Sequence, residues 1–382
     1  MLKKLSLAAL VAMGSMSVAS ATDLSEAIKG VDLKGYMRLR AYYESDKDAN
    51  TDKAGTQSTR WRTTAAFNFT VPVSEDVKFH SDFAFDWNMY NDAQQDGAAQ
   101  PTNTHMFVDA SKNGANLKIG KIPVVTPVTG KGVGEALGAG AIAAYKVNDS
   151  LTVAAAGLDT LANTDKVTVA GKNTVAAAAI YKSDVADVQA WYFNVEDLID
   201  SDVVLSADIK ALKDSGIKIH VDYAQAELSD KAGATMTANE DTIPAGLKAD
   251  KTQTYLNVNA SFKKDKVCAK LGYAVTGKDG GVVVLDGDAS IASVLGTEQQ
   301  TGIADTTDNN AVYAKVGYNV DKKTNVFVAY STIDEKSSNE VLVGAKYKYT
   351  KKFGVYAYYS VLDQSSKGQD NNEARVEFKY TF

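Results

Sequence analysis

The chain of 382 residues has little of several residue types, and each shortage excludes a class of structure. A single cysteine, Cys268, rules out an internal disulfide framework. No apolar run beyond residue 21 is long enough for a transmembrane helix. Only five prolines are present, which suits a chain built mostly of hydrogen-bonded strands. Bases are outnumbered by acids, and a formal net charge of −6 argues against a nucleic-acid partner.

The first 21 residues are typical of a secretory signal peptide. Lys3 and Lys4 precede an apolar stretch from Leu5 to Val18, and Ala19–Ala21 is an A-x-A cleavage site. Cleavage there predicts a mature chain that starts near Thr22 and has a formal net charge of −8. No linker divides the remainder, so we expect residues 22–382 to form a single domain.

Alternating apolar and polar residues are the main structural signal, and they are clearest in the last twelve residues. There, one parity is apolar and the other is polar, as in a strand with two different faces. The apolar parity consists of Ala374, Val376, Phe378, Tyr380 and Phe382. The same pattern predicts strands over residues 35–43, 59–71, 77–90, 104–111, 117–122, 138–147, 151–158, 174–182, 188–195, 202–212, 217–226, 252–262, 267–276, 311–320, 325–332, 340–349, 353–361 and 371–382.

About 18 strands of this length predict an all-β fold, a transmembrane antiparallel β-barrel with short periplasmic turns and long outer loops. We expect turns and long loops to alternate strictly and every proline to lie in one of them. Closure by pairing of the last strand with the first leaves no bare backbone in lipid. The alternative is a secreted solenoid or multi-domain sandwich, which would have apolar residues on both faces of some strands and no difference between turns and loops.

Residues that would signal an enzyme are not arranged for catalysis or metal binding. The three histidines, His80, His105 and His220, lie on separate predicted strands without a ligand at a familiar spacing. Neither a Gly-x-Ser-x-Gly nor a His-Glu-x-x-His motif occurs. An outer-membrane hydrolase is conceivable, but no spacing supports it. We therefore expect a protein that is not an enzyme and requires no cofactor.

Arginine use is the most informative functional signal. All five arginines fall on the polar face of the first, second and last predicted strands: Arg38, Arg40, Arg60, Arg62 and Arg375. A closed barrel makes these strands neighbours, which predicts one basic patch on the pore wall, with Lys78, Asp82 and Asp86 also pore-lining. The other interpretation is structural, with the arginines paired to Glu377, Asp82 or Asp86. The two interpretations are compatible.

Residues 123–137 are glycine-rich and apolar, unlike a solvated outer loop. We expect them to fold inward as a constriction loop whose charged residues are Lys121, Lys131 and Glu135. Residues 227–251 and 277–308 are instead expected on the outer surface.

Three stretches resemble the major outer membrane porins of Campylobacter and related epsilonproteobacteria. They are Thr22–Asp32, Ile119–Pro127 and Lys146–Asp159. The resemblance implies a trimer of 18-stranded barrels, each a water-filled channel for small hydrophilic solutes with a mild cation preference. It also implies a calcium ion near the constriction, for which Asp159 matches one acidic position. Gly130 stands where an aspartate would be expected, which is a departure from the family pattern.

The sequence therefore predicts a general-diffusion porin of the bacterial outer membrane, weakly cation-preferring. Expected partners are two further copies of the chain in a homotrimer, outer-membrane lipid and lipopolysaccharide, and the barrel assembly machinery through the C-terminal strand. The chain has no plug domain of the kind a gated transporter carries. The alternative is an adhesin or structural barrel that acts through its surface loops.

Overall fold

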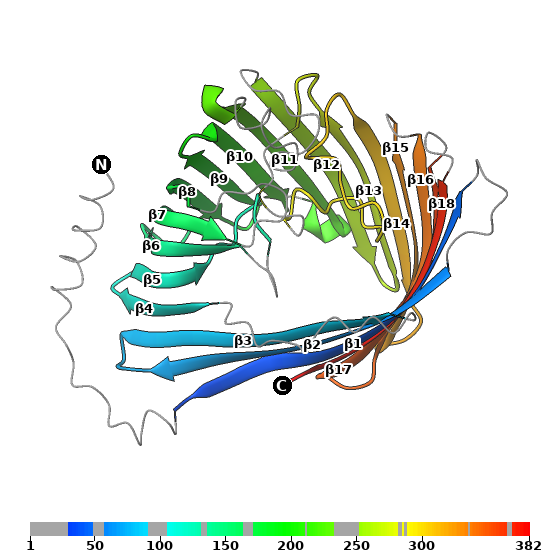
Figure 1. Cartoon of the computed structure of the whole chain (residues 1–382), viewed down its shortest axis with the longest axis horizontal. Coiled ribbons are helices and arrows are strands. Elements are labelled where there is room, and N and C mark those ends of the chain that lie inside the picture. The colour runs from blue at the N-terminus through cyan, green and yellow to red at the C-terminus, as the bar shows by residue number, and fades with distance from the viewer. Residues whose placement is uncertain are drawn as a thin grey trace.

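The computed structural model describes residues 30–48, 57–90, 105–130, 136–162, 171–210, 212–232, 252–281, 285, 289–334, 337–364 and 369–382. These residues form one closed antiparallel barrel of 18 strands (Figure 1). None of the helices in this part of the chain is long and apolar enough to cross a membrane. The predicted all-β barrel is therefore confirmed.

The strands follow one another around the barrel in chain order. A single 3-10 turn, η1 (Lys213–Ser215), lies between two of them. The strands are β1 (Asp32–Asp48), β2 (Gln57–Pro72), β3 (Val77–Tyr90), β4 (Met106–Lys112), β5 (Ala115–Pro123), β6 (Leu137–Lys146), β7 (Leu151–Ala162), β8 (Thr174–Lys182), β9 (Ala186–Val195), β10 (Ile199–Ile209), β11 (Ile217–Leu228), β12 (Thr252–Lys264), β13 (Val267–Thr276), β14 (Asn310–Asn319), β15 (Thr324–Ile333), β16 (Ser338–Lys348), β17 (Phe353–Gln364) and β18 (Gln369–Thr381).

The barrel closes where the first strand meets the last. Strand β1 pairs with β2 on one side and with β18 on the other. At the end of this seam the Phe382 amide donates to the Gly35 carbonyl at 3.1 Å, and the Gly35 amide donates back at 3.3 Å. The Phe382 ring packs 5.7 Å from the Phe67 ring, between centroids. The terminal strand thus leaves no open sheet edge, as predicted.

The two faces of the sheet differ in the way the alternation predicts. Large apolar side chains are exposed on the outer face: Met37 is 52% exposed, Trp61 46% and Leu271 61%. Because side chains along a strand alternate, the neighbours of these residues point into the barrel. That inner face carries most of the charged and amide side chains, which is the arrangement needed when lipid lies outside and water inside.

Connections at the two ends of the barrel differ in length, but not as strictly as predicted. One end has only short turns, such as 113–114 and 265–266. The other end has the long connections, yet residues 196–198, 334–337 and 365–368 are short there too. The prediction that short turns and long loops alternate strictly was therefore wrong, because the strands on either side of these three connections extend until only three or four residues join them.

The prediction that every proline lies in a turn or loop also needs correction. Pro72 is the last residue of β2 and Pro123 the last residue of β5. A proline is tolerated there because the final residue of a strand need not donate a ladder hydrogen bond.

The longest connection, between β13 and β14, folds into the barrel and not onto its outer surface (Figure 1, yellow). Its described residues bury Ile291, Leu295 and Ile303 almost completely. They pack against the 124–130 segment, and the Leu285 amide donates to the Val128 carbonyl at 3.0 Å. The expectation that residues 277–308 lie on the outer surface was wrong for the described part of this connection, because its apolar side chains are buried inside the barrel.

A glycine in β13 makes room for a tyrosine on the next strand. Gly272 lies directly opposite Tyr313, and a Cβ built on Gly272 would fall within the Tyr313 ring. Tyr313 is buried and donates its hydroxyl proton to Asn257 Oδ1 at 2.7 Å. We expect Gly272→Ala to displace this ring and to lower the free energy of unfolding by about 1–3 kcal/mol, measured by denaturant titration in lipid vesicles.

The matched control is Gly354→Ala in β17. The nearest non-neighbouring atom to a Cβ at Gly354 is the Tyr347 carbonyl oxygen at 3.5 Å, an ordinary contact. The control should change the free energy of unfolding by less than about 0.5 kcal/mol. Equal losses from both variants would show that Tyr313 does not depend on the space above Gly272.

Candidate functional site

The inner face of β18, β1 and β2 brings all five arginines together. Arg40 lies directly opposite Arg62 on β2, and Tyr42 lies between Arg60 on β2 and Arg375 on β18. Arg38 completes the group and lies opposite Lys379. The contiguity expected from barrel closure is present, and we call these five residues the arginine wall.

Three members of the arginine wall are neutralised by acids. Arg60 forms an ion pair with Glu44 at 2.9 Å, and Arg375 forms one with Glu298 at 3.0 Å. Arg62 binds Asp86, donating from Nε to both carboxylate oxygens at 3.0 Å and also from Nη2. The structural interpretation thus holds for this subset, but of its three acids only Asp86 was predicted as a partner, and Glu44 and Glu298 were not.

The other two members form no ion pair with a described acid, although Glu377 on β18 lies directly opposite Arg40. Arg38 donates from Nη2 to Thr64 Oγ1 at 3.4 Å and makes no ion pair with a described acid. Arg40 is only 8% exposed, and its Nε and Nη2 have no hydrogen-bond partner in the described part of the chain. A buried guanidinium without hydrogen-bond partners costs free energy, so Arg40 is the least compensated member of the arginine wall.

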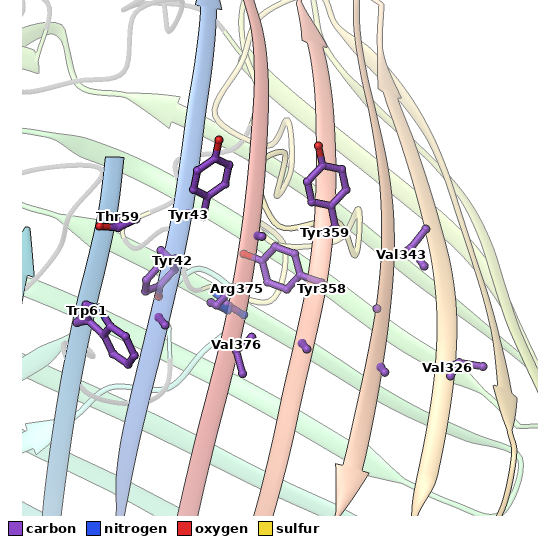
Figure 2. Close-up of a pocket in the computed structure, with 15 residues that line it drawn as sticks. Tyr42, Tyr43, Thr59, Trp61, Val326, Val343, Tyr358, Tyr359, Arg375 and Val376 are labelled. Atoms are coloured by element: carbon purple, nitrogen blue, oxygen red, sulfur yellow. The ribbon is translucent and has the colours of Figure 1, made fainter. Parts of the chain in front are cut away.

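Tyrosine rings separate the arginines, a feature that the sequence analysis missed. The Arg60 guanidinium carbon lies 4.2 Å from the centre of the Tyr42 ring, and that of Arg375 lies 4.7 Å from the Tyr358 ring. Figure 2 shows Tyr42, Arg375 and Tyr358 side by side on three neighbouring strands. The signal was present, because these tyrosines share the parity of the arginines.

The remaining predicted pore residues share the inward parity of β3 but differ in surroundings. Asp82 is buried and accepts the His105 amide proton at 2.6 Å, with the His105 ring 3.2 Å away. Asp86 lies farther along β3, opposite Thr64, whose hydroxyl donates to it at 3.1 Å. Lys78 lies exposed near the short-turn end, opposite Asp109. Asp82 and Asp86 thus hold neighbouring groups in place.

The opposite side of the ring carries an acidic chain of hydrogen bonds. His220 on β11 lies between Asp208, 2.8 Å from its Nδ1, and Asp222, 2.8 Å from its Nε2. Asp222 is 1% exposed and also accepts from Asn257 at 3.0 Å. In the strand order β10 and β11 lie halfway around the barrel from β1 and β2. This wall thus carries carboxylates where the opposite wall carries arginines, although Asp208 is also paired with Lys218 at 2.7 Å.

A buried carboxylate anchors the inward 289–309 segment to the wall. Glu340 on β16 is 0% exposed and accepts backbone N–H groups of Glu298, Gln299 and Gln300, at 3.1, 3.1 and 2.7 Å. The Ser360 hydroxyl adds a fourth bond at 2.6 Å. Glu298, at the tip held this way, reaches Arg375 of the arginine wall. Sequence gave no sign of this anchor, since Glu340 falls within an ordinary alternating strand.

The residues predicted for a constriction loop are not all placed. Lys131 and Glu135 lie outside the described residues. Lys121 lies within β5, directly opposite Met106, which is exposed on the outer face. Placing Lys121 in the inward loop was wrong, because β5 continues to Pro123 and its ladder fixes the direction of the side chain.

Asp159 lies exposed on β7, beside an irregularity in the pairing of β6 with β7. Within the described ranges, no group of three or more histidine, cysteine, aspartate or glutamate residues is arranged to hold a metal ion. The assignment of Asp159 as a calcium ligand stays a prediction.

Comparison with known proteins agrees with this geometry. Residues 1–175 match the model of a family described as Campylobacter major outer membrane protein. No curated protein sequence matches. The barrel is similar to solved structures of OccK5 from Pseudomonas aeruginosa (TM-score 0.68, 13% identity, 92% of this chain and 98% of that one) and OccAB3 from Acinetobacter baumannii (TM-score 0.69, 13% identity, 92% and 99%). A structure of Pseudomonas aeruginosa OpdK with vanillate is similar as well (TM-score 0.67, 14% identity, 92% and 98%).

Proposed function

We propose that this chain, whose residues 1–175 match the model of the Campylobacter major outer membrane protein family, acts as a general-diffusion porin. The coarser conclusion, a porin channel of the outer membrane, is supported by the family match and the closed barrel. The finer proposal is a water-filled passage for small hydrophilic solutes and ions. The observation that supports it is the polar inner face of the closed barrel, which carries the arginine wall on one side and the carboxylates Asp208 and Asp222 on the other.

The proposed selectivity is a weak preference for cations. The net charge of −6 and the Asp222 carboxylate favour cations, whereas Arg38 and Arg40 favour anions; Asp208 is paired with Lys218. Charges separated by more than about 8 Å are screened at physiological ionic strength, so each wall acts mainly on ions passing close to it. Carboxylates on one wall and arginines on the other, most of them paired, thus favour a small net preference.

Conductance in planar lipid bilayers tests the function. Purified protein should give large ohmic steps, and a salt gradient should give a small reversal potential of the sign expected for cations. No steps at any voltage would remove the porin proposal. In that case the adhesin or structural barrel, acting through long connections such as 229–251, would become the better account.

The same proposal includes the partners. The assembled form in this proposal is a homotrimer that lies in outer-membrane lipid and lipopolysaccharide. The barrel assembly machinery inserts it into the membrane. Light scattering of the purified protein tests the trimer. The channel needs no cofactor in this proposal. If calcium binds at Asp159, a chelator should change the conductance of the wild type but not of Asp159→Asn.

Deleting Phe382 should impair assembly. The deletion removes the two hydrogen bonds to Gly35 and the ring that packs on Phe67, so the seam loses its last contacts. We expect a clear fall in the amount of folded barrel in the outer membrane, measured by heat-modifiable migration on gels. Phe382→Tyr keeps the ring and the backbone and should assemble normally; equal yields of the deletion and the wild type would contradict the role of this contact.

A further inference from the structure

One section of the short-turn end carries an unusual concentration of lysine. Three neighbouring turns, which join β12 to β13, β14 to β15 and β16 to β17, and the strand ends beside them supply eight exposed lysines. We call them the lysine rim: Lys263, Lys264, Lys266, Lys322, Lys323, Lys348, Lys351 and Lys352. The only acids in the same turns are Asp265 and Asp321.

Asp321 is engaged by its own turn. Its carboxylate accepts the backbone N–H groups of Lys323 and Thr324, both at 2.7 Å. None of the eight lysines forms an ion pair with a described acid. Two of them donate to backbone carbonyls instead, Lys266 to Val320 at 3.2 Å and Lys323 to Tyr349 at 3.4 Å. The rim therefore presents a net positive surface.

Lysines on the rest of the same end behave differently. There four amines lie at ion-pair distance from acids: Lys112 with Asp76 at 3.1 Å, Lys146 with Asp149 at 2.7 Å, Lys210 with Asp187 at 2.6 Å and Lys218 with Asp208 at 2.7 Å. Single lysines such as Lys78 and Lys182 also lack an ion pair with a described acid, but the β12–β17 section is where such lysines are clustered.

Exposed aromatic and branched apolar side chains lie next to the lysine rim. On the outer face Tyr318, Val320, Tyr347 and Tyr349 are all exposed, and Tyr349 is the most exposed of them. Tyrosine at the end of an apolar band marks the boundary between hydrocarbon and headgroups. The rim lysines therefore lie at the level of the headgroups; Lys263 and Lys348 share the inward parity of their strands, so the other six are the ones that can face the headgroups.

We propose that the lysine rim binds the anionic headgroups of phospholipids in the periplasmic leaflet of the outer membrane. Short turns face the periplasm in barrels of this class, which places the rim at that leaflet. Lysine is a mobile point charge that suits a fluid layer of phosphates, whereas the rigid arginine forks of this chain all lie inside the barrel. The proposal rests on the barrel spanning the membrane and does not require that it conduct.

Lipid counting tests the proposal. Full-length protein in neutral detergent is titrated with phosphatidylglycerol or with phosphatidylcholine, and bound lipids are counted by native mass spectrometry. Wild type should prefer phosphatidylglycerol by at least about fivefold, the factor expected from a single engaged lysine near an anionic surface. About 1 M salt, where the screening length is about 3 Å, should abolish the preference.

Changing the eight rim lysines to glutamine should remove the preference, and changing them to arginine should keep it. The matched control changes Lys112, Lys146, Lys210 and Lys218 to glutamine and should bind as the wild type does. Heat-modifiable migration checks that each variant is folded. Equal phosphatidylglycerol binding by wild type and the folded glutamine variant would overturn the proposal. Rim-dependent binding to peptidoglycan sacculi, with unchanged lipid counts, would overturn it in favour of an acidic wall polymer.

Discussion

Replacing Glu340 with alanine is expected to raise the single-channel conductance and to make the open current noisier. The substitution removes the acceptor of three backbone N–H groups at the tip of the inward segment. Hydrogen bonds to a charged group contribute about 1.5–3 kcal/mol each, so loss of this anchor favours release of the tip by at least about 100-fold. A released tip leaves more of the cross-section open to ions.

Ser360→Ala is the graded control, because it removes only one of the four bonds to Glu340. It should change the current little, while Glu340→Ala changes it strongly. The measurement is single-channel recording of the two variants in the same salt. If the current through Glu340→Ala has the amplitude and noise of the wild type, the 289–309 segment does not limit conduction.

Replacing Arg38 and Arg40 together with glutamine is expected to increase the preference for cations severalfold. These two charges form no ion pair with a described acid, so we expect their field to act on passing ions. A unit charge about 4 Å from an ion contributes about 1 kcal/mol in water, which is about a fivefold factor in its probability of passage. The reversal potential in a salt gradient measures the change.

The control for this experiment removes an equal number of charges from the same wall. Glu44→Gln with Arg60→Gln deletes an ion pair and leaves the net charge unchanged. The pair variant should keep the wild-type reversal potential. An identical reversal potential in wild type and the Arg38, Arg40 variant would mean that this part of the wall lies outside the permeation path.

The strands and the faces of the barrel could be predicted because they depend on local alternation. Apolar and charged residues alternate in these strands, as in Trp61 with Arg62 and in Phe378 with Glu377. This period of two arises because successive side chains of a strand point to opposite faces of the sheet. Closure then follows from the same pattern, since an apolar last strand in lipid must pair with the first. The grouping of the five arginines needed only these two steps.

Which arginines are neutralised could not be predicted, because it depends on the register of three strands and on a distant segment. Glu44 reaches Arg60 only in the observed pairing of β1 with β2, and Glu298 reaches Arg375 only because residues 289–309 fold inward. The inward fold was missed because its apolar residues are scattered, without a helical or strand period. Lys121 was misplaced for a related reason, since the end of β5 decides its face.

The pairing of β1 with β18 also determines when the arginine wall forms during folding. Partners such as Arg40 and Glu377 are separated by nearly the whole chain, and contacts of such separation form slowly. Arg375 belongs to the last strand made, whereas the other four arginines belong to the first two. Until β18 pairs with β1, Arg375 is separated from the other four arginines, so the complete arginine wall exists only in the closed barrel.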